Sequence, residues 1–379
     1  MSGVLSFVLL MAATARGAPL ECPPQAREEA PPADFDRWFE DATVRLDIDH
    51  GGTATTEDVT LKALRREGPW PGSRTRLVDP AGLGKYLVEV RDRATDLLIY
   101  SRGFCTLFGE WQTTDEAKTG RQVFPETVRF PLPRAPARVV LRGRGADGAL
   151  ATIWETAVEP AAVQPGAPAA AEVVLLHDGG PSATALDVVI VPAGYLPHQE
   201  EKLRRDLARF AALLLATPPF DRDAARIAVR GVVALALRPG AAEPRKGRVA
   251  DADGLRPTFD TFGSARYLNA LGHHALRDLA GAAPYDTLLV MVNTSQYGGA
   301  GIFNYYAVFP SDNDYDAYVF IHELGHSFAG LGDEYYSSSV AYSEFYPQGV
   351  EPWEPNITAL LDGREGLKWG ALVDPSTPV

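Results

Sequence analysis

One five-residue segment, His322-Glu-Leu-Gly-His326, constrains the fold of this chain more than any other feature of the sequence. On an α-helix, residues four positions apart lie on one face, so both imidazoles can reach a single zinc ion. Glu323 then lies beside the ion, where its carboxylate can act as a general base. The motif therefore predicts a helix over residues 316–328 with a zinc site on one face.

A catalytic zinc site has three protein ligands and leaves the fourth coordination position open for water. Gly330 can adopt the left-handed conformation that ends a helix, and the chain can then turn back toward the histidines. Relative to the pattern HExxHxxGxxH of metzincins, the glycine and the last ligand are displaced by one position. Asp333 is accordingly the first choice for the third ligand, and Glu334 is the second.

A thermolysin-like arrangement is the other alternative, in which a later glutamate, Glu351 or Glu365, completes the site. The chemistry expected in either case is hydrolysis of a peptide bond, with Glu323 taking the proton of a zinc-bound water. Neither Cys22 nor Cys105 has a neighbouring ligand at metal-binding spacing.

Composition limits the classes of binding partner, and the N-terminal segment indicates where the protein acts. The net charge of −13, without a basic stripe, argues against nucleic acid as a partner. Residues 4–15 form an apolar run followed by small residues, which predicts a signal peptide over residues 1–18. No other segment approaches a membrane span. We therefore expect a secreted or periplasmic protein.

The pattern along the chain predicts a multidomain α+β protein. A linker is expected over residues 19–34, an antiparallel β-sandwich over 35–157, a second linker over 158–180, and an α/β catalytic domain over 181–379. The expected sandwich strands cover residues 43–48, 86–90, 97–100, 126–130, 137–141 and 151–155. The second domain is expected to have strands at 185–192, 227–237 and 287–292 and helices at 199–216 and 264–279.

A glycine-rich segment at residues 297–304 lacks the features of a phosphate-binding loop. Glycines in a strand allow close backbone approach, and the edge strand of a protease cleft can hydrogen-bond an extended substrate. We expect this segment to be such an edge strand.

Together with residues 262–267 and 297–304, the segment 322–336 resembles the bacterial IgA-peptidase family, metallopeptidase family sixty-four. Residues 35–142 are similar to the β-sandwich N-terminal domain of that family. The resemblance implies a secreted, metzincin-like zinc peptidase acting on a protein or peptide substrate. It also implies His322 and His326 as ligands and Glu323 as the catalytic residue.

Metzincins place a methionine turn downstream of the ligands, but the methionines here are Met1, Met11 and Met291. We therefore expect the C-terminal part of the catalytic domain to be missing. This leaves two hypotheses of different class. The first is a zinc-dependent endopeptidase, and the alternative is an exported glycan- or protein-binding protein with an inactive, truncated peptidase domain. Glu323 favours the endopeptidase, because a binding module needs no base beside the metal.

Overall fold

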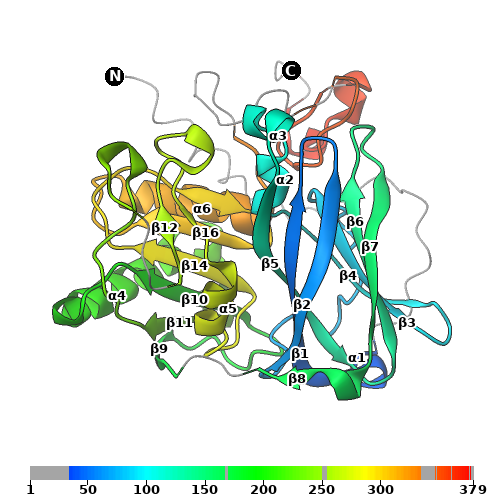
Figure 1. Cartoon of the computed structure of the whole chain (residues 1–379), viewed down its shortest axis with the longest axis horizontal. Helices are drawn as coiled ribbons and strands as arrows, with labels where there is room; N and C mark the ends of the chain where they lie inside the picture. The colour runs from blue at the N-terminus through cyan, green and yellow to red at the C-terminus, as the bar shows by residue number, and fades with distance from the viewer. Residues whose placement is uncertain are drawn as a thin grey trace.

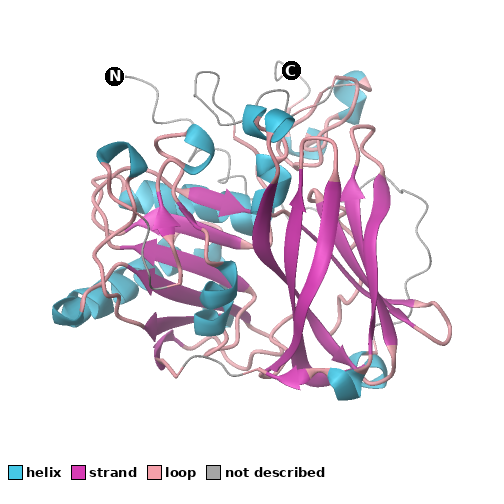
Figure 2. Cartoon of the chain, in the orientation of Figure 1, coloured by secondary structure: helices cyan, strands magenta, loops and turns pink. Residues whose placement is uncertain are grey.

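The computed structural model describes residues 34–166, 170–249, 254–333, 346, 348–359, 361–374 and 376. The predicted leader, residues 19–33 of the first linker, and Glu334 lie outside these ranges. Figure 1 shows the sheets of the N-terminal half on one side of the molecule and a six-stranded sheet on the other. Figure 2 shows that the N-terminal half is mostly strand, whereas helices gather around the second sheet.

Two four-stranded sheets, in the orders β5-β1-β2-β8 and β4-β3-β6-β7, form the N-terminal half. Their neighbouring strands are antiparallel except for the short β2–β8 pair. Side chains from both sheets, including Leu46, Tyr86, Phe130 and Leu141, meet in one buried cluster. This arrangement is the predicted sandwich. The elements are α1 Phe35–Trp38, β1 Phe39–Gly52, β2 Glu57–Glu67, β3 Tyr86–Asp92, β4 Leu98–Phe104, α2 Leu107–Trp111, α3 Asp115–Thr119, β5 Gln122–Pro133, β6 Ala137–Arg144, β7 Leu150–Val158 and β8 Gln164–Pro165.

The second half is built on a mixed sheet in the order β15-β16-β14-β10-β11-β9. Its four central strands run parallel, and β15 and β9 are antiparallel edge strands. Its elements are β9 Glu172–His177, β10 Leu186–Ala193, α4 Glu200–Ala216, β11 Ile227–Val233, β12 Pro257–Thr258, β13 Asn269–Ala270, α5 His273–Ala280, β14 Thr287–Val292, β15 Ala300–Ile302, β16 Tyr306–Pro310 and α6 Asp316–Ala329. The 3₁₀ helices are η2 Pro160–Ala162, η3 Pro197–Gln199, η4 Phe220–Arg226, η5 Pro244–Lys246, η6 Thr261–Gly263, η7 Gly363–Gly366 and η8 Gly370–Leu372.

Strand β14 explains the layers of this half, because every one of its residues is buried. Leu289 and Met291 point into the cluster that holds Phe210 of α4 and Phe320 of α6. The alternate residues of β14 join a second cluster with Leu276 of α5. A strand that is covered on both faces has a continuous apolar sequence, and this is why a strand could be predicted here. Helices therefore cover both faces of the sheet.

The predicted helix over residues 264–279 is wrong in its first half, and α5 begins only at His273. Before it, the Leu268 backbone N–H donates to the Gly299 carbonyl at 3.3 Å, and the Gly299 N–H donates to the Arg266 carbonyl at 3.1 Å. This long-range pairing with the glycine-rich segment overrides the local helical spacing. Strand β9 lies within the range expected as the second linker and pairs with β11.

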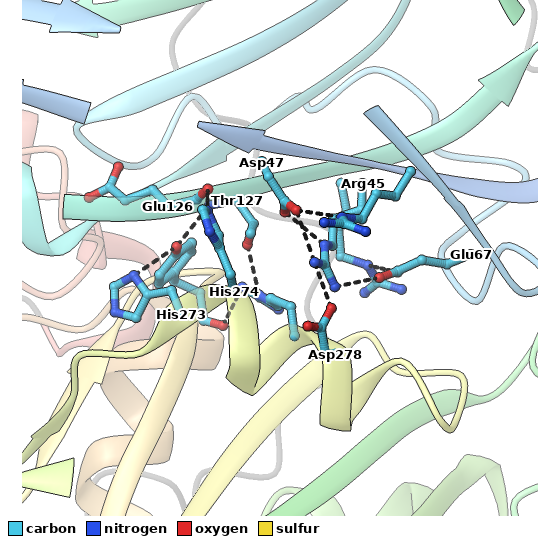
Figure 3. A network of polar contacts seen from close by, with 12 residues as sticks. Arg45, Asp47, Glu67, Glu126, Thr127, His273, His274 and Asp278 are labelled. Atoms are coloured by element: carbon cyan, nitrogen blue, oxygen red, sulfur yellow. Dashed lines mark hydrogen bonds and ion pairs between the residues drawn. The ribbon is translucent and has the colours of Figure 1, made fainter. Parts of the chain in front are cut away.

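The two halves share a polar interface along β5 and α5 (Figure 3). Arg277 donates from Nε to Thr127 Oγ1 at 2.9 Å and from Nη2 to the Tyr305 carbonyl at 3.0 Å. The Thr127 N–H donates to the Tyr305 hydroxyl at 3.0 Å, and His274 Nε2 donates to the Glu126 carbonyl at 3.2 Å. The core is also shared, since Phe108 and Trp111 of α2 lie in the same cluster as Leu276. The halves therefore form one packed unit.

Candidate metal centre

Helix α6 packs one face on the sheet and carries its two motif histidines on a less buried face. Val319, Phe320 and Leu324 are buried against the sheet, and His322 and His326 are only partly buried. The helix ends as the sequence predicts, with Gly330 in the left-handed region at φ 66°. The Gly330 N–H donates to the His326 carbonyl at 3.0 Å, which closes the last turn. The chain after Gly330 then returns toward the motif.

Three side chains converge where that return meets α6. Asp333 Oδ1 lies 3.2 Å from Nε2 of His322 and 3.2 Å from Nε2 of His326, and the two Nε2 atoms are 3.1 Å apart. Ligands with bonds of about 2.0–2.1 Å in tetrahedral geometry are separated by about 3.3 Å, so this donor set fits a zinc ion. His326 Nδ1 donates to the Leu331 carbonyl, which leaves the Nε2 lone pair directed at the cluster.

Electrostatics at this cluster favour positive charge. Burial opposes the charged form of His326, yet hydrogen bonding to Asp333 and the nearby Glu323 raise its pKa to about 9. A group of carboxylates that stabilises an imidazolium also stabilises a bound cation. The chemistry of the residues present therefore fits a divalent metal.

Glu323 is 9% exposed and lies beside the cluster. Ligand atoms of His322, Glu323 and His326 all lie within 4.8 Å of one another, which leaves Glu323 as a second candidate for the third ligand. The Asp333 oxygen is 3.2 Å from both Nε2 atoms, which is close to the separation of two ligands in a tetrahedral site. Burial raises the pKa of Glu323, which makes its carboxylate a stronger base than an exposed glutamate.

The other predicted ligands lie elsewhere or outside the described residues. Glu351 is exposed and pairs with Lys368 Nζ at 3.2 Å. Glu365 lies exposed in η7. Glu334 has no described position, so its role stays a prediction.

Strand β15 is an edge strand of the sheet and packs directly against α6, as expected for the glycine-rich segment. A Cβ atom on Gly299 would lie 2.5 Å from Glu323 Oε1. A Cβ atom on Gly301 would lie 2.3 Å from the Glu323 carbonyl oxygen and 2.6 Å from His326 Cβ. Gly301 therefore allows β15 to lie against the backbone of the motif, and a side chain at Gly299 would displace the Glu323 carboxylate.

A cavity of about 880 Å³ opens over the cluster, and both halves of the chain line it. The second half contributes the motif, Tyr267 and β15. The sandwich half contributes Lys85, Glu110 and Arg144. The Cys105 backbone N–H donates to the Phe303 carbonyl at 2.9 Å, which joins the sandwich to the end of β15 at the cavity wall.

Sequence reasoning missed Glu110 and Tyr267, which form a hydrogen-bonded pair across the domain boundary, with the Tyr267 hydroxyl donating to Glu110 Oε2. Burial raises the pKa of Glu110 to about 7, against the lowering effect of that hydrogen bond. Nothing in the local sequence of either residue signals this contact. The segment 108–111 was recognised only as part of the resemblance to the family.

Sequence models of two known families match the chain. The sequence model of IgA Peptidase M64 matches residues 174–379, and that of Peptidase M64 N-terminus matches residues 34–155. No curated protein matches the chain. Among the described residues, no helix has the length and apolarity needed to cross a membrane.

Proposed function

This chain belongs to the M64 peptidase family, and we propose that it is a zinc-dependent endopeptidase acting on protein or peptide substrates. The observation that carries the proposal is the convergence of His322, His326 and Asp333 beside Glu323 within one cavity. A nucleophilic serine or cysteine is not needed in such a site, because water is the attacking group.

In the proposed reaction, His322, His326 and Asp333 would hold the metal. Zinc bound there would supply a Lewis acid for the scissile carbonyl and would lower the pKa of water. Glu323 accepts a proton from the attacking water at its carboxylate and passes it to the leaving amine. The burial of Glu323 supports this role, because it raises the proton affinity of the carboxylate.

Substrate alignment is proposed to use the edge strand β15. The absence of side chains at Gly299 and Gly301 leaves its backbone close to Glu323. The backbone of Gly299 already pairs with Arg266 and Leu268, so an extended peptide would add to the edge at β15 itself, with its carbonyl groups along the motif. We further propose that the chain is exported, on the basis of the apolar run at residues 4–15.

Metal analysis and a cleavage assay on the purified full chain test the proposal. The wild type and Glu323→Gln should each bind about one zinc ion, because Glu323 is not a ligand. Glu323→Gln should cleave a mixed peptide library about 100-fold more slowly or worse, because a general base is lost. Equal cleavage by both proteins would end the enzyme assignment and favour the alternative of an exported binding protein. Export is tested by determining the N-terminus of the protein recovered outside the producing cell.

A further inference from the structure

Two cations of the sandwich, Lys85 and Arg144, lie together in the wall of the cavity that holds the metal centre. Lys85 immediately precedes β3, and Arg144 is the last residue of β6. These strands are paired, with Tyr86 opposite Gly143. Lys85 Nζ donates to the Arg144 carbonyl at 2.5 Å, so the two side chains belong to one local structure.

Backbone carbonyl groups hold the Arg144 guanidinium in place. Its Nε donates to Gly84 O at 3.0 Å, its Nη1 to Gly148 O at 2.8 Å and its Nη2 to Gly82 O at 2.7 Å. A guanidinium has five N–H groups, so these bonds leave donors for a further acceptor. The three carbonyls are uncharged, so they position Arg144 without neutralising it.

Neither cation forms an ion pair with a carboxylate in the part of the chain that the structure describes. Arg142, two residues earlier on β6, provides the contrast, because its Nε pairs with Glu89 Oε1 at 2.7 Å. Burial lowers the pKa of both Lys85 and Arg144. The cavity wall therefore holds two partly desolvated positive charges, which attract an anion more strongly than exposed cations do.

Among the described residues, the acidic groups that face this pair form no ion pair with it. Glu57 attracts Lys85, but its direct partner is His50, whose Nε2 lies 2.8 Å from Glu57 and which also pairs with Glu126. Glu354 attracts Arg144 and is 2% exposed, and burial raises its pKa to about 7. Across the cavity, the carboxylate of Glu110 accepts the Tyr267 hydroxyl. Positive charge remains available to a ligand at Lys85 and Arg144.

We propose that Lys85 and Arg144 form a subsite that binds a carboxylate of the peptide substrate, either an acidic side chain or the C-terminal carboxylate. The inference rests on the proposed peptidase function, since it places substrate in this cavity. It assigns the sandwich half a direct role in substrate choice. Charge-assisted hydrogen bonds to both cations would make a carboxylate the preferred group at this position.

Peptide binding to full-length, zinc-loaded Glu323→Gln tests the subsite without requiring turnover. In the first peptide set, a single Asp is placed at each position in turn, and each peptide is compared with its Asn counterpart. In the second set, each peptide is compared with a free and with an amidated C-terminus. We expect one Asp position, or the free C-terminus, to bind about tenfold or more tightly, the gain of a charge-assisted bond. The first result identifies an acidic side chain, and the second identifies the C-terminal carboxylate.

Lys85→Met in the same background should reduce the preference to near unity, and Lys85→Arg should retain most of it. Lys62→Met is the matched control, because Lys62 pairs with Asp49 and does not line the cavity. Arg144→Gln is a second variant, used with thermal unfolding because Arg144 also supports three backbone carbonyls. Equal binding of acidic and neutral peptides, or a preference that survives Lys85→Met and a folded Arg144→Gln, would overturn the subsite. Zinc content and cleavage of neutral peptides report on the peptidase proposal separately.

Discussion

Asp333 Oδ1 lies 3.2 Å from His326 Nε2, although the two residues are separated by the end of α6 and a left-handed turn. If Asp333 is the third ligand, Asp333→Ala should reduce zinc from about one ion per chain to a small fraction after dialysis. The two histidines that remain are too few, because structural and catalytic zinc sites have at least three protein ligands. Plasma emission analysis of zinc, with circular dichroism as a check of folding, measures this.

Glu365→Ala serves as the control for that variant, because Glu365 is an exposed glutamate in η7 and was a candidate ligand on sequence grounds. It should retain full zinc. If Asp333→Ala retains full zinc, the third ligand is Glu323 or Glu334 instead.

The close approach of β15 to α6 predicts a stability effect at Gly301. A Cβ atom there would lie 2.3 Å from the Glu323 carbonyl oxygen, and backbone cannot move away as a flexible side chain can. Gly301→Ala should therefore lower the free energy of unfolding by about 1–3 kcal/mol and weaken zinc binding, since α6 must shift. Gly68→Ala is the control, because nothing lies within 4 Å of a Cβ atom at that position. Denaturant unfolding of both variants makes the comparison; equal stability would mean that β15 moves freely.

The sequence was most informative where function and structure are local. The motif, the helix that carries it and the return of Asp333 all follow from a short segment that ends in a glycine turn. The buried strands β10 and β14 were recognisable from continuous apolar runs. In contrast, β2 was missed because its charged residues hide the alternation, although it pairs with β1 along its length.

The cavity wall could not be predicted, because it is formed by residues brought together through packing of the two halves. Glu110 and Tyr267 are separated by 157 positions in the chain, and their contact depends on the shared interface. Lys85 and Arg144 meet through the pairing of β3 with β6. The sequence around each residue resembles that of any strand end, so it does not indicate a binding site.

The interface between the halves should be sensitive to the loss of Arg277. This side chain is 5% exposed and donates to Thr127 and to the Tyr305 carbonyl. Arg277→Met removes these bonds and leaves a buried carbonyl without its donor, at a cost of about 2–4 kcal/mol. Arg226→Met is the control, because the ion pair of Arg226 among the described residues is an exposed contact of 3.9 Å with Asp223. Its loss should change stability by less than about 0.5 kcal/mol. Urea unfolding curves that coincide for the two variants would show that the Arg277 network contributes little.

His50 predicts how stability depends on pH. It lies 2.7 Å from Glu126 Oε2 and 2.8 Å from Glu57 Oε1. Burial disfavours its charged form, but the two carboxylates outweigh this and raise its pKa from 6.5 to about 9. A raised pKa in the folded state means that the stabilisation is complete below about pH 6.5 and is lost as pH rises through about 9. The loss should be about 3 kcal/mol, since each pKa unit is worth about 1.4 kcal/mol.

The measurement is the free energy of unfolding by urea at a series of pH values from 6 to about 9.5. The wild type should lose stability across this window, and His50→Gln should be less stable at pH 6 with a flatter profile, because the neutral amide cannot gain a charge. His198→Gln, a change at an exposed histidine, should keep the wild-type slope. A His50→Gln profile parallel to that of the wild type would assign the pH dependence to other groups and show that His50 is neutral in the folded protein.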